Sequence, residues 1–340
     1  MRILVLGGTR FVGRHIVEAA RADGHAVSVF NRGRTPVPWD DVEQLRGDRG
    51  GALAALRGRS WDACIDVSGY LPEEVRASAG LLAGHVARYV FISTASVYDL
   101  AGAAPGIDET GALLAVADGE GDVPAAALYG SRKVACEHEA KRAFPGRALI
   151  LRPVIVAGPF DPTNRFAWWV ERIARGGEIL APVGPAAPVQ LIDGRDLAAF
   201  ALALTTAGAA GVFTVCAPTS TFGELIAACR AATLSDASPT WVPESVLLEH
   251  GVEPFAELPL WLDDTPEHRI FPTFSNARAR AAGLALRSLE ETARDTWRWL
   301  CAVRAGEEPG PIAGGFVARG LSPEREAAVL ADVHGRAGRA

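Results

Sequence analysis

The sequence contains almost no lysine. Of its 34 basic residues only Lys133 and Lys141 are lysines, so arginine supplies the positive charge nearly everywhere else. Because an ammonium and a planar guanidinium are not interchangeable, a lysine kept against this background indicates a task that arginine cannot perform. Lys133 stands out further because Tyr129 lies four residues before it, in the segment Tyr129-Gly130-Ser131-Arg132-Lys133.

Long hydrophobic runs, clustered cysteines and an excess of positive charge are also lacking. No apolar run is long enough to span a bilayer, so we expect no membrane association. The apolar stretch of residues 1–6 is followed directly by glycines and is too short for a signal peptide, so we expect a cytoplasmic location. Five scattered cysteines predict small core residues in a reducing compartment, and no metal site is expected. The net charge of −6 gives no general attraction to nucleic acid, so no nucleic-acid partner is expected.

A strand, a glycine-rich loop, a helix and a second strand are predicted at the N-terminus. Residues 3–6 form a continuous apolar run, residues 7–13 are the loop, apolar residues then recur at helical spacing, and residues 26–30 form the second strand. Glycines in this position let a pyrophosphate approach the backbone N–H groups at the helix N-terminus. The unit therefore predicts a dinucleotide-binding site.

The loop departs from the usual pattern in a way that bears on the cofactor. Gly7 and Gly13 keep the outer glycines, but Arg10 occupies the middle position, and Asn31 stands where an acidic residue would bind the adenosine ribose. The basic side chains near this point are Arg10, Arg32 and Arg34. Arginines can surround a 2′-phosphate, which favours NADP over NAD; the alternative is that they are solvated loop residues.

The alternation of elements continues through the N-terminal half. Strands are predicted at 63–67, 88–92 and 148–151, and helices at about 72–82 and 129–144. This order predicts an α/β fold with a doubly wound parallel (Rossmann) sheet, whose ligand lies at the carboxyl ends of the strands.

Three regions are expected along the chain. Residues 1–155 would form the NAD(P)-binding domain, to which a strand near 189–196 returns, and residues 156–305 a smaller C-terminal substrate-binding domain. Residues 306–340 would be a tail with one short helix, with Ser322 as N-cap and Pro323 at its first position. The tail can pack on the domain, stay mobile or mediate a homodimer.

Tyr129 and Lys133 predict acid–base chemistry if they lie on a helix, because four residues place both side chains on one face. A neighbouring cation favours the phenolate and lowers the pKa of the tyrosine. The alternative, from spacing alone, is an exposed tyrosine and lysine on a helix surface.

Taken together, these segments resemble the short-chain dehydrogenase/reductase superfamily, in its extended branch of NAD(P)-dependent epimerases, dehydratases and reductases. The matching segments are 7–13, 91–94, 129–133, 151–153 running to 158–159, and 190–196, so the resemblance covers roughly residues 1–300. It implies an enzyme that transfers a hydride between the nicotinamide and a carbonyl or carbinol carbon of a small-molecule, sugar-like or natural-product substrate.

The resemblance also implies roles for individual residues. Tyr129 would exchange a proton with the substrate oxygen, Lys133 would hold the nicotinamide ribose and lower the Tyr129 pKa, and Thr94 would hydrogen-bond the reacting oxygen. For Thr94 the alternative is a strand-end threonine that satisfies backbone groups. The positions implied to bind the cofactor are Gly7, Thr9, Arg10, Phe11, Val12, Asn31, Arg32, Val67, Ser68, Tyr129, Lys133 and Pro153.

Departures from the family pattern narrow the choice among the reactions of this family. Dehydratases of this branch carry Asp-Glu directly after the threonine and sugar-acid decarboxylases carry a Glu at the position of Ser96, whereas this chain has Ala95 and Ser96. Nucleotide-sugar enzymes usually have an asparagine at the position of Ile155. A reductase is therefore the first interpretation. The alternatives are a (nucleotide-)sugar epimerase acting through a transient ketone, and a non-catalytic NADP-sensing or RNA-binding member of the fold.

Two further segments concern the substrate. Arg165 could bind an anionic or polyhydroxy group, and Trp168 could stack on a ring, although we expect Trp168 or Trp169 to pack a helix against the Rossmann core. Residues 102–125 interrupt the domain between Thr94 and Tyr129, and they predict either a lid over the active site or a solvated insertion.

Overall fold

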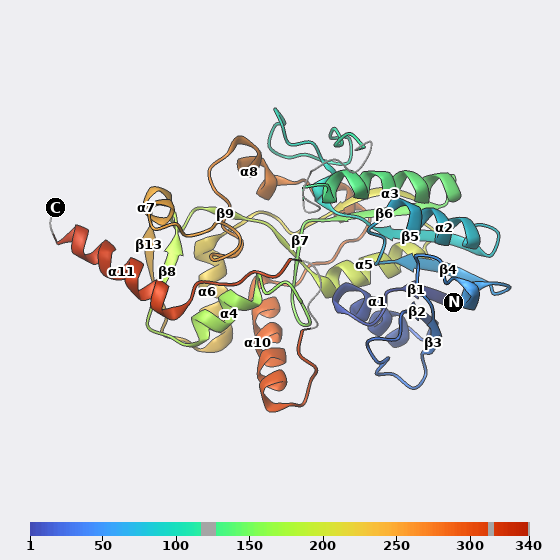
Figure 1. Cartoon of the computed structure of the whole chain (residues 1–340), viewed down its shortest axis with the longest axis horizontal. Coiled ribbons are helices and arrows are strands. Elements are labelled where there is room, and N and C mark those ends of the chain that lie inside the picture. The colour runs from blue at the N-terminus through green and yellow to red at the C-terminus, as the bar shows by residue number, and fades with distance from the viewer. Residues whose placement is uncertain (117–126, 312–315, 339–340) are drawn as a thin grey trace. The chain divides into compact units, whose positions relative to one another are not determined.

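The computed structural model describes residues 1–116, 127–311 and 316–338, and the chain divides into two compact units (Figure 1). The first unit consists of Met1–Ile155, Gly194–Ala217 and Phe274–Ala285. The second consists of Val156–Asp193, Pro218–Thr273 and Leu286–Ala340. Residues 194–217 and 274–285 thus group with the first unit, which corrects the assignment of all of 156–305 to a single region.

A seven-stranded sheet forms the centre of the first unit. In spatial order its strands are β11 (Gly211–Val215), β6 (Ala148–Pro153), β5 (Val86–Ile92), β4 (Trp61–Asp66), β1 (Arg2–Leu6), β2 (Ala26–Asn31) and β3 (Glu43–Arg46). All neighbouring strands are parallel. The sheet therefore confirms the predicted doubly wound α/β fold.

Helices cover both faces of this sheet. α1 (Phe11–Ala22) and α5 (Gly194–Thr206) pack together on one face, and α2 (Pro72–Leu82) and α3 (Tyr129–Ala143) pack together on the other (Figure 1). The continuous apolar run of β1 is fully buried between the two layers, as expected of a central parallel strand. Under α2 and α3, Tyr89 stacks on Phe144 in the main hydrophobic cluster.

Two strands of the sheet differ from the sequence-based prediction. The segment near 189–196 does not return to the sheet: it forms β9 (Pro188–Val189), β10 (Leu191–Asp193), which pairs with β7 (Ile155–Ala157), and the start of α5. The strand that does return is β11, which pairs with β6. The strand β3 was also not predicted, because it is a short edge strand in which only Leu45 is buried and Glu43 and Arg46 at its two ends are exposed.

The second unit is built around three helices that pack on one another, α4 (Ala167–Ala174), α6 (Phe222–Thr233) and α10 (Leu289–Ala305). Both α6 and α10 begin with a complete capping box, at Thr221 and Ser288. The remaining elements are β8 (Glu178–Pro182), β12 (Ser220–Thr221), β13 (Ser238–Val242), α7 (Glu244–Glu249), α8 (Pro266–Ile270) and α11 (Pro323–Ala337).

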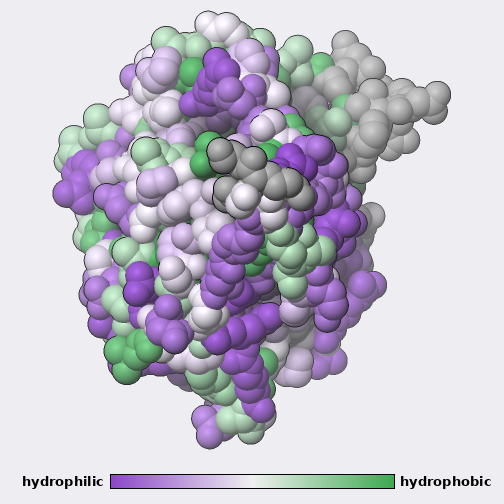
Figure 2. Space-filling model, turned by 90° about the vertical axis from the view of Figure 1, so that its left-hand side faces the viewer, coloured by the Kyte–Doolittle hydropathy of each residue, from purple (hydrophilic) through white to green (hydrophobic). Residues whose placement is uncertain are grey.

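The tail helix packs on the second unit. As predicted, Ser322 caps α11 by accepting from the Arg325 amide, and Pro323 is its first residue. The buried Glu326 carboxylate accepts from Arg172 Nε at 2.6 Å and from the Leu180 amide at 2.9 Å. On the face shown in Figure 2, hydrophilic residues predominate and the hydrophobic ones form small separate groups, because most of the larger apolar side chains of this unit are buried, with exceptions such as Leu234 and Leu248.

Most of the cysteines are buried. Cys64, Cys136, Cys216 and Cys229 are buried free thiols, as predicted, whereas Cys301 is exposed on α10. No helix in the described ranges is long and apolar enough to cross a membrane.

Candidate active site

The glycine loop brings helix α1 very close to the end of β1. A Cβ atom at Gly13 would lie 2.4 Å from the Gly7 carbonyl oxygen, closer than real Cβ contacts, so only glycine permits this approach. Gly7 itself has a φ of +92°, and a Cβ there would lie 2.8 Å from the Ser68 Cβ. The loop is therefore held between the ends of β1 and β4 by contacts that leave no room for side chains.

The N-terminus of α1 has the features of an anion site. Its N-cap residue, Arg10, is in an extended conformation and makes no side-chain cap, and the first turn contains no acidic residue. The positive end of the helix dipole is thus not neutralised by the helix's own side chains. These features fit a cofactor pyrophosphate, for which Thr9 to Val12 would supply backbone N–H groups.

Asn31, at the end of β2, is suited to bind a further polar group. Its Oδ1 accepts from the Gly33 amide at 2.8 Å and from Gln44 Nε2 at 3.1 Å. Its Nδ2 is buried and has no hydrogen-bond partner among the described residues. An unsatisfied buried donor is uncommon, and a ribose hydroxyl or phosphate oxygen at this point would satisfy it.

Four arginines lie near Asn31. Arg10 Nε donates to Thr35 Oγ1 at 3.4 Å, which places Arg10 against the loop that carries the exposed Arg32 and Arg34. Arg46 is the fourth: it opposes Asn31 in the register of β2 and β3, and its side chain lies 3.3 Å from where a Gly33 Cβ would be. Sequence reasoning missed Arg46 because it missed β3.

Thr94 ends the segment that follows β5. Its hydroxyl accepts from the Ser96 amide at 3.1 Å and donates to Ser96 Oγ at 3.1 Å, and so caps the short 3₁₀ turn Ala95–Val97. Thr94 therefore does satisfy a backbone group, as the alternative interpretation held. The proton that it gives to Ser96 Oγ is nevertheless available to a ligand, because a hydroxyl can rotate.

Gly130 brings helix α3 close to this turn. A Cβ at Gly130 would lie only 2.1 Å from the Ser96 carbonyl oxygen, so a larger residue would force the helix away. Tyr129, the first residue of α3, is 38% exposed and directly precedes Gly130 in the chain. Gly130 lies within the Tyr129–Lys133 segment, but no local pattern indicated this role for it.

Lys133 lies one turn after Tyr129 and is only 3% exposed. Its ammonium donates to the carbonyls of Ile92 at 2.7 Å and Gly69 at 3.0 Å, and lies 4.1 Å from the centre of the Phe91 ring. Burial lowers the pKa of Lys133 from 10.5 to about 8. The ammonium is thus fixed at the carboxyl ends of β4 and β5, and the two carbonyl bonds use two of its three N–H donors.

Glu137 lies on α3 one turn beyond Lys133, and its strongest partners belong to other elements. It is fully buried, and its carboxylate accepts from Arg152 at 2.7 and 2.9 Å and from Ser93 Oγ at 2.7 Å. Lys141 pairs with it at 3.3 Å. Burial alone would raise the pKa of Glu137, but Arg152 holds it below its ordinary value. This group fastens α3 to β6 one turn beyond Lys133.

The part of the 102–125 segment that the structure describes, up to residue 116, folds back on the first unit. Leu113 pairs with Tyr98, the Leu114 amide donates to the Val97 carbonyl, and Glu109 accepts from the Thr214 amide at 2.6 Å. These contacts argue against a freely solvated insertion for residues 102–116. The acidic run from Asp118 to Asp122 lies outside the described residues.

The two predicted substrate residues belong to the second unit. Arg165 Nε donates to Thr163 Oγ1 at 2.9 Å, and its guanidinium lies 5.6 Å from the Phe255 ring. Trp168 is 6% exposed and lies against Gly320 of the tail, where a Cβ would come within 2.0 Å of Nε1. Its neighbour Trp169 packs within the second unit, against Phe222, which corrects the expectation of packing on the Rossmann core.

The residues of the first unit therefore fit a bound dinucleotide. The close glycine loop, the uncapped helix and the unsatisfied Asn31 donor would hold the pyrophosphate and adenosine, and Lys133 would reach the second ribose. Val67 and Ser68 directly follow β4, and Pro153 is the last residue of β6, so all three lie at the carboxyl-end edge of the sheet. In the described parts of the chain, no three His, Cys, Asp or Glu side chains gather as a metal site.

Comparison with solved structures shows the same fold. The UDP-glucuronic acid 4-epimerase from Bacillus cereus in complex with NAD superposes with a TM-score of 0.65 and 15% identity, covering 90% of this chain and 98% of that one. A UDP-N-acetylglucosamine 4-epimerase from Methanobrevibacter ruminantium M1, in complex with UDP-N-acetylmuramic acid, has a TM-score of 0.65 and 17% identity, covering 89% and 98%.

Comparison of sequences identifies the family. A curated relative, the chloroplast stem-loop binding protein of 41 kDa b from Arabidopsis thaliana, is 26% identical over 214 residues, which are 58% of this chain and 53% of that protein. The chain thus spans about half the length of this relative. The model of the NAD dependent epimerase/dehydratase family matches residues 3–80 and 71–216. The resemblance inferred from the motifs is confirmed, and the chain belongs to the NAD dependent epimerase/dehydratase family.

Proposed function

We propose that this protein is an NADP-preferring reductase that transfers a hydride between the nicotinamide and a carbonyl or carbinol carbon of a small-molecule substrate. The observation that carries the proposal is the Lys133 ammonium, buried at the carboxyl ends of β4 and β5 one turn after the half-exposed Tyr129. Keeping a lysine charged in such surroundings is unfavourable, and perturbed groups of this kind are concentrated at functional sites.

The residues of the chain have distinct tasks in this reaction. The bound nicotinamide supplies the hydride. Thr94 donates a hydrogen bond to the substrate oxygen, turning its proton from Ser96 Oγ, and Tyr129 gives that oxygen a proton as the carbonyl becomes an alcohol. Lys133 stabilises the resulting phenolate, and Tyr129, being 38% exposed, regains its proton from solvent.

Substitution of Tyr129 tests this assignment. Tyr129→Phe removes the proton donor and should reduce turnover by about 100- to 10,000-fold while leaving NADPH binding within about twofold. Turnover can be followed as NADPH oxidation with a panel of ketones and aldehydes, and binding by the fluorescence of NADPH. Undiminished turnover in Tyr129→Phe would remove this tyrosine from the mechanism.

The preference for NADP rests on the arginines near Asn31. Charge-assisted contacts to a 2′-phosphate would come from Arg10, Arg32 and Arg46, with Arg34 close by. Arg46→Ala and Arg32→Ala should each weaken NADP binding about tenfold and change NAD binding little, because NAD lacks the phosphate. Tighter binding of NAD than of NADP by the unaltered protein would contradict the preference.

An epimerase acting through a transient ketone is the second candidate, favoured by the fold shared with the two nucleotide-sugar epimerases. A reductase consumes one reduced cofactor per product, whereas an epimerase regenerates its cofactor within each turnover. Incubation with candidate UDP-sugars, followed by analysis of both the sugar and the cofactor, separates the two. Conversion of the sugar without net change of the cofactor would establish the epimerase.

A member of the fold that binds RNA without catalysis is a third candidate, favoured by the stem-loop binding relative. The net charge of −6 offers little general attraction to a polyanion. Electrophoretic mobility shifts with stem-loop RNA at physiological salt distinguish this function from the reductase. Tight binding that Tyr129→Phe leaves unchanged, together with absence of turnover, would favour the RNA-binding function.

A further inference from the structure

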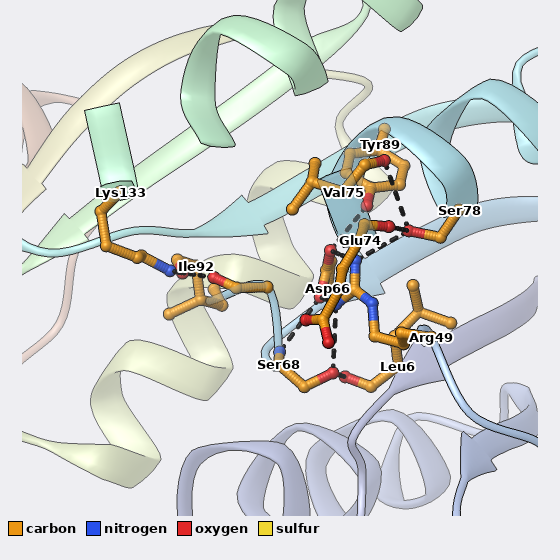
Figure 3. A network of polar contacts seen from close by, with 11 residues as sticks. Leu6, Arg49, Asp66, Ser68, Glu74, Val75, Ser78, Tyr89, Ile92 and Lys133 are labelled. Carbon is orange, nitrogen blue, oxygen red and sulfur yellow. Dashed lines mark hydrogen bonds and ion pairs between the residues drawn. The ribbon is translucent and has the colours of Figure 1, made fainter. Parts of the chain in front are cut away.

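Arg49 and Asp66 form a buried ion pair beside the proposed cofactor site, and no motif in the sequence pointed to it. Asp66 ends β4 and is fully buried, and Arg49 comes from the loop after β3 and is 8% exposed. The two guanidinium NH groups of Arg49 donate to the two carboxylate oxygens at 2.5 and 2.7 Å (Figure 3). This is the bidentate geometry that gives such a pair its directional strength.

The Asp66 carboxylate is fully occupied by donors. Besides the two bonds from Arg49, its Oδ1 accepts from the Ser68 amide at 3.0 Å and its Oδ2 from the Tyr89 hydroxyl at 2.6 Å. Each oxygen therefore has two partners. Burial alone would raise the pKa of Asp66, but Arg49 holds it below its ordinary value, so the carboxylate stays ionised.

The hydrogen bonds of the pair reach Ser68, which connects it to the glycine loop on one side and, through Gly69, to Lys133 on the other. Arg49 also donates to Ser68 Oγ at 3.2 Å, and Ser68 Oγ donates to the Leu6 carbonyl at 3.2 Å, directly before the glycine loop (Figure 3). On the other side, the residue after Ser68 is Gly69, whose carbonyl accepts from the Lys133 ammonium. Residues 68 and 69 therefore join the glycine loop to Lys133.

We propose that Arg49 and Asp66 are positioning residues, which hold Ser68 and Gly69 so that the Gly69 carbonyl meets the Lys133 ammonium and Ser68 lies against the glycine loop. A pair that served stability alone would not need to bond both the amide and the hydroxyl of a residue that lines the site. The inference deepens the proposed function and rests on it for the role of Lys133, but the geometry of Lys133 can be measured without any cofactor.

The scarcity of lysine makes this measurement direct. Protein labelled with [ε-¹³C]lysine gives two side-chain NMR signals, from Lys133 and Lys141, and Lys133→Met assigns them. The charges that act on Lys133 are Asp66 and Glu137, which raise its pKa, and Arg49, which lowers it, with Cys136 beside them. Asp66 acts on Lys133 more strongly than Arg49 does, so loss of the two charges alone would lower the Lys133 pKa, and a rise in this pKa reports a change of position.

The test variant is therefore Arg49→Gln/Asp66→Asn. If the pair positions residues 68 and 69, its loss lets water reach Lys133, and the Lys133 pKa should rise from about 8 by about one unit or more toward its ordinary value. Binding of NADPH should weaken about tenfold or more. A folded double variant whose Lys133 pKa and NADPH affinity both match the unaltered protein would overturn the proposal.

Tyr89→Phe is the matched control. It removes one hydrogen bond to the same carboxylate but keeps the Arg49 fork, the contacts to Ser68 and the stacking on Phe144. We expect a loss of thermal stability without a change in the Lys133 pKa or in NADPH affinity. A shift of the Lys133 pKa equal to that of the double variant would show that general loosening, and not positioning, is responsible.

Amide hydrogen exchange of the unaltered protein decides the matter if the double variant does not fold. The Ser68 amide, although in a loop, donates to a buried carboxylate and should exchange as slowly as amides of β4. Exchange at the rate of an open loop would overturn the proposal. Should NADPH not bind at all, the proposed function fails, whereas the pKa and exchange measurements still test the pair itself.

Discussion

The two lysines of this protein lie on the same helix, about two turns apart, in opposite surroundings. Lys133 is 3% exposed and bonds two backbone carbonyls, whereas the Lys141 side chain is 41% exposed and pairs with a carboxylate of its own helix. Burial lowers the pKa of Lys133 to about 8. The comparison shows that the surroundings at the end of the sheet, and not the residue type, lower the pKa of a lysine on this helix.

The largest difference should appear in turnover. Lys133→Met removes the cation that we propose stabilises the Tyr129 phenolate, and it should lower kcat by about 100- to 10,000-fold, whereas Lys141→Met should change it by less than about twofold. Lys133→Arg should not restore activity, because a broad planar guanidinium differs in size and donor geometry from the ammonium that bonds the Gly69 and Ile92 carbonyls. Equal activity of the two methionine variants, measured as NADPH oxidation, would remove the distinction between the lysines.

The buried partner of Lys141 should matter more for stability than Lys141 itself. Glu137→Gln leaves the Arg152 guanidinium, which is 2% exposed, without its counter-charge and should lower the free energy of unfolding by about 3–5 kcal/mol. Lys141→Met removes only a partly exposed pair and should change it by less than about 1 kcal/mol. Urea unfolding followed by tryptophan fluorescence measures both. Similar losses in the two variants would show that Arg152 finds other partners.

Lys133 should also give the protein a distinctive dependence of stability on pH. Its pKa is about 8 in the folded state and about 10.5 when unfolded, so between these values the unfolded chain binds more protons and stability rises with pH. The rise attributable to Lys133 should approach about 3 kcal/mol by pH 10.5. The difference between unaltered protein and Lys133→Met across pH 7–10.5 isolates it, and a constant difference would contradict the lowered pKa.

A smaller difference in stability should separate substitution of Gly130, near the start of α3, from substitution of Gly80 in α2. Gly130→Ala places a Cβ 2.1 Å from the Ser96 carbonyl oxygen and should cost about 1–3 kcal/mol of stability, together with much of the turnover. Gly80→Ala in α2 meets no atom within 4 Å and should stabilise the protein by about 0.5–1 kcal/mol. Thermal unfolding measures both, and a stable, active Gly130→Ala variant would separate this contact from the site.

Much of the first unit was predictable from local patterns. Short, mostly apolar segments identified β1, β2, β4, β5 and β6, and the glycine loop marked the start of α1, because these signals come from residues close together in sequence. The weak edge strand β3 and the returning strand β11 were not found, since each depends on pairing with a distant strand. Because β3 was not predicted, Arg46 was not recognised as a candidate cofactor-binding residue.

For the candidate site, the sequence by itself determined which residues to examine: the glycine loop, Thr94, Tyr129 and Lys133, whose spacing and chemistry are local properties. Only the tertiary structure decided that Lys133 is buried, that Glu137 faces Arg152, that Trp168 lies under the tail, and that Arg49 supports Asp66. The reason is physical. Burial and charge pairing depend on which distant segments come into contact, and the local sequence around a residue does not determine these contacts.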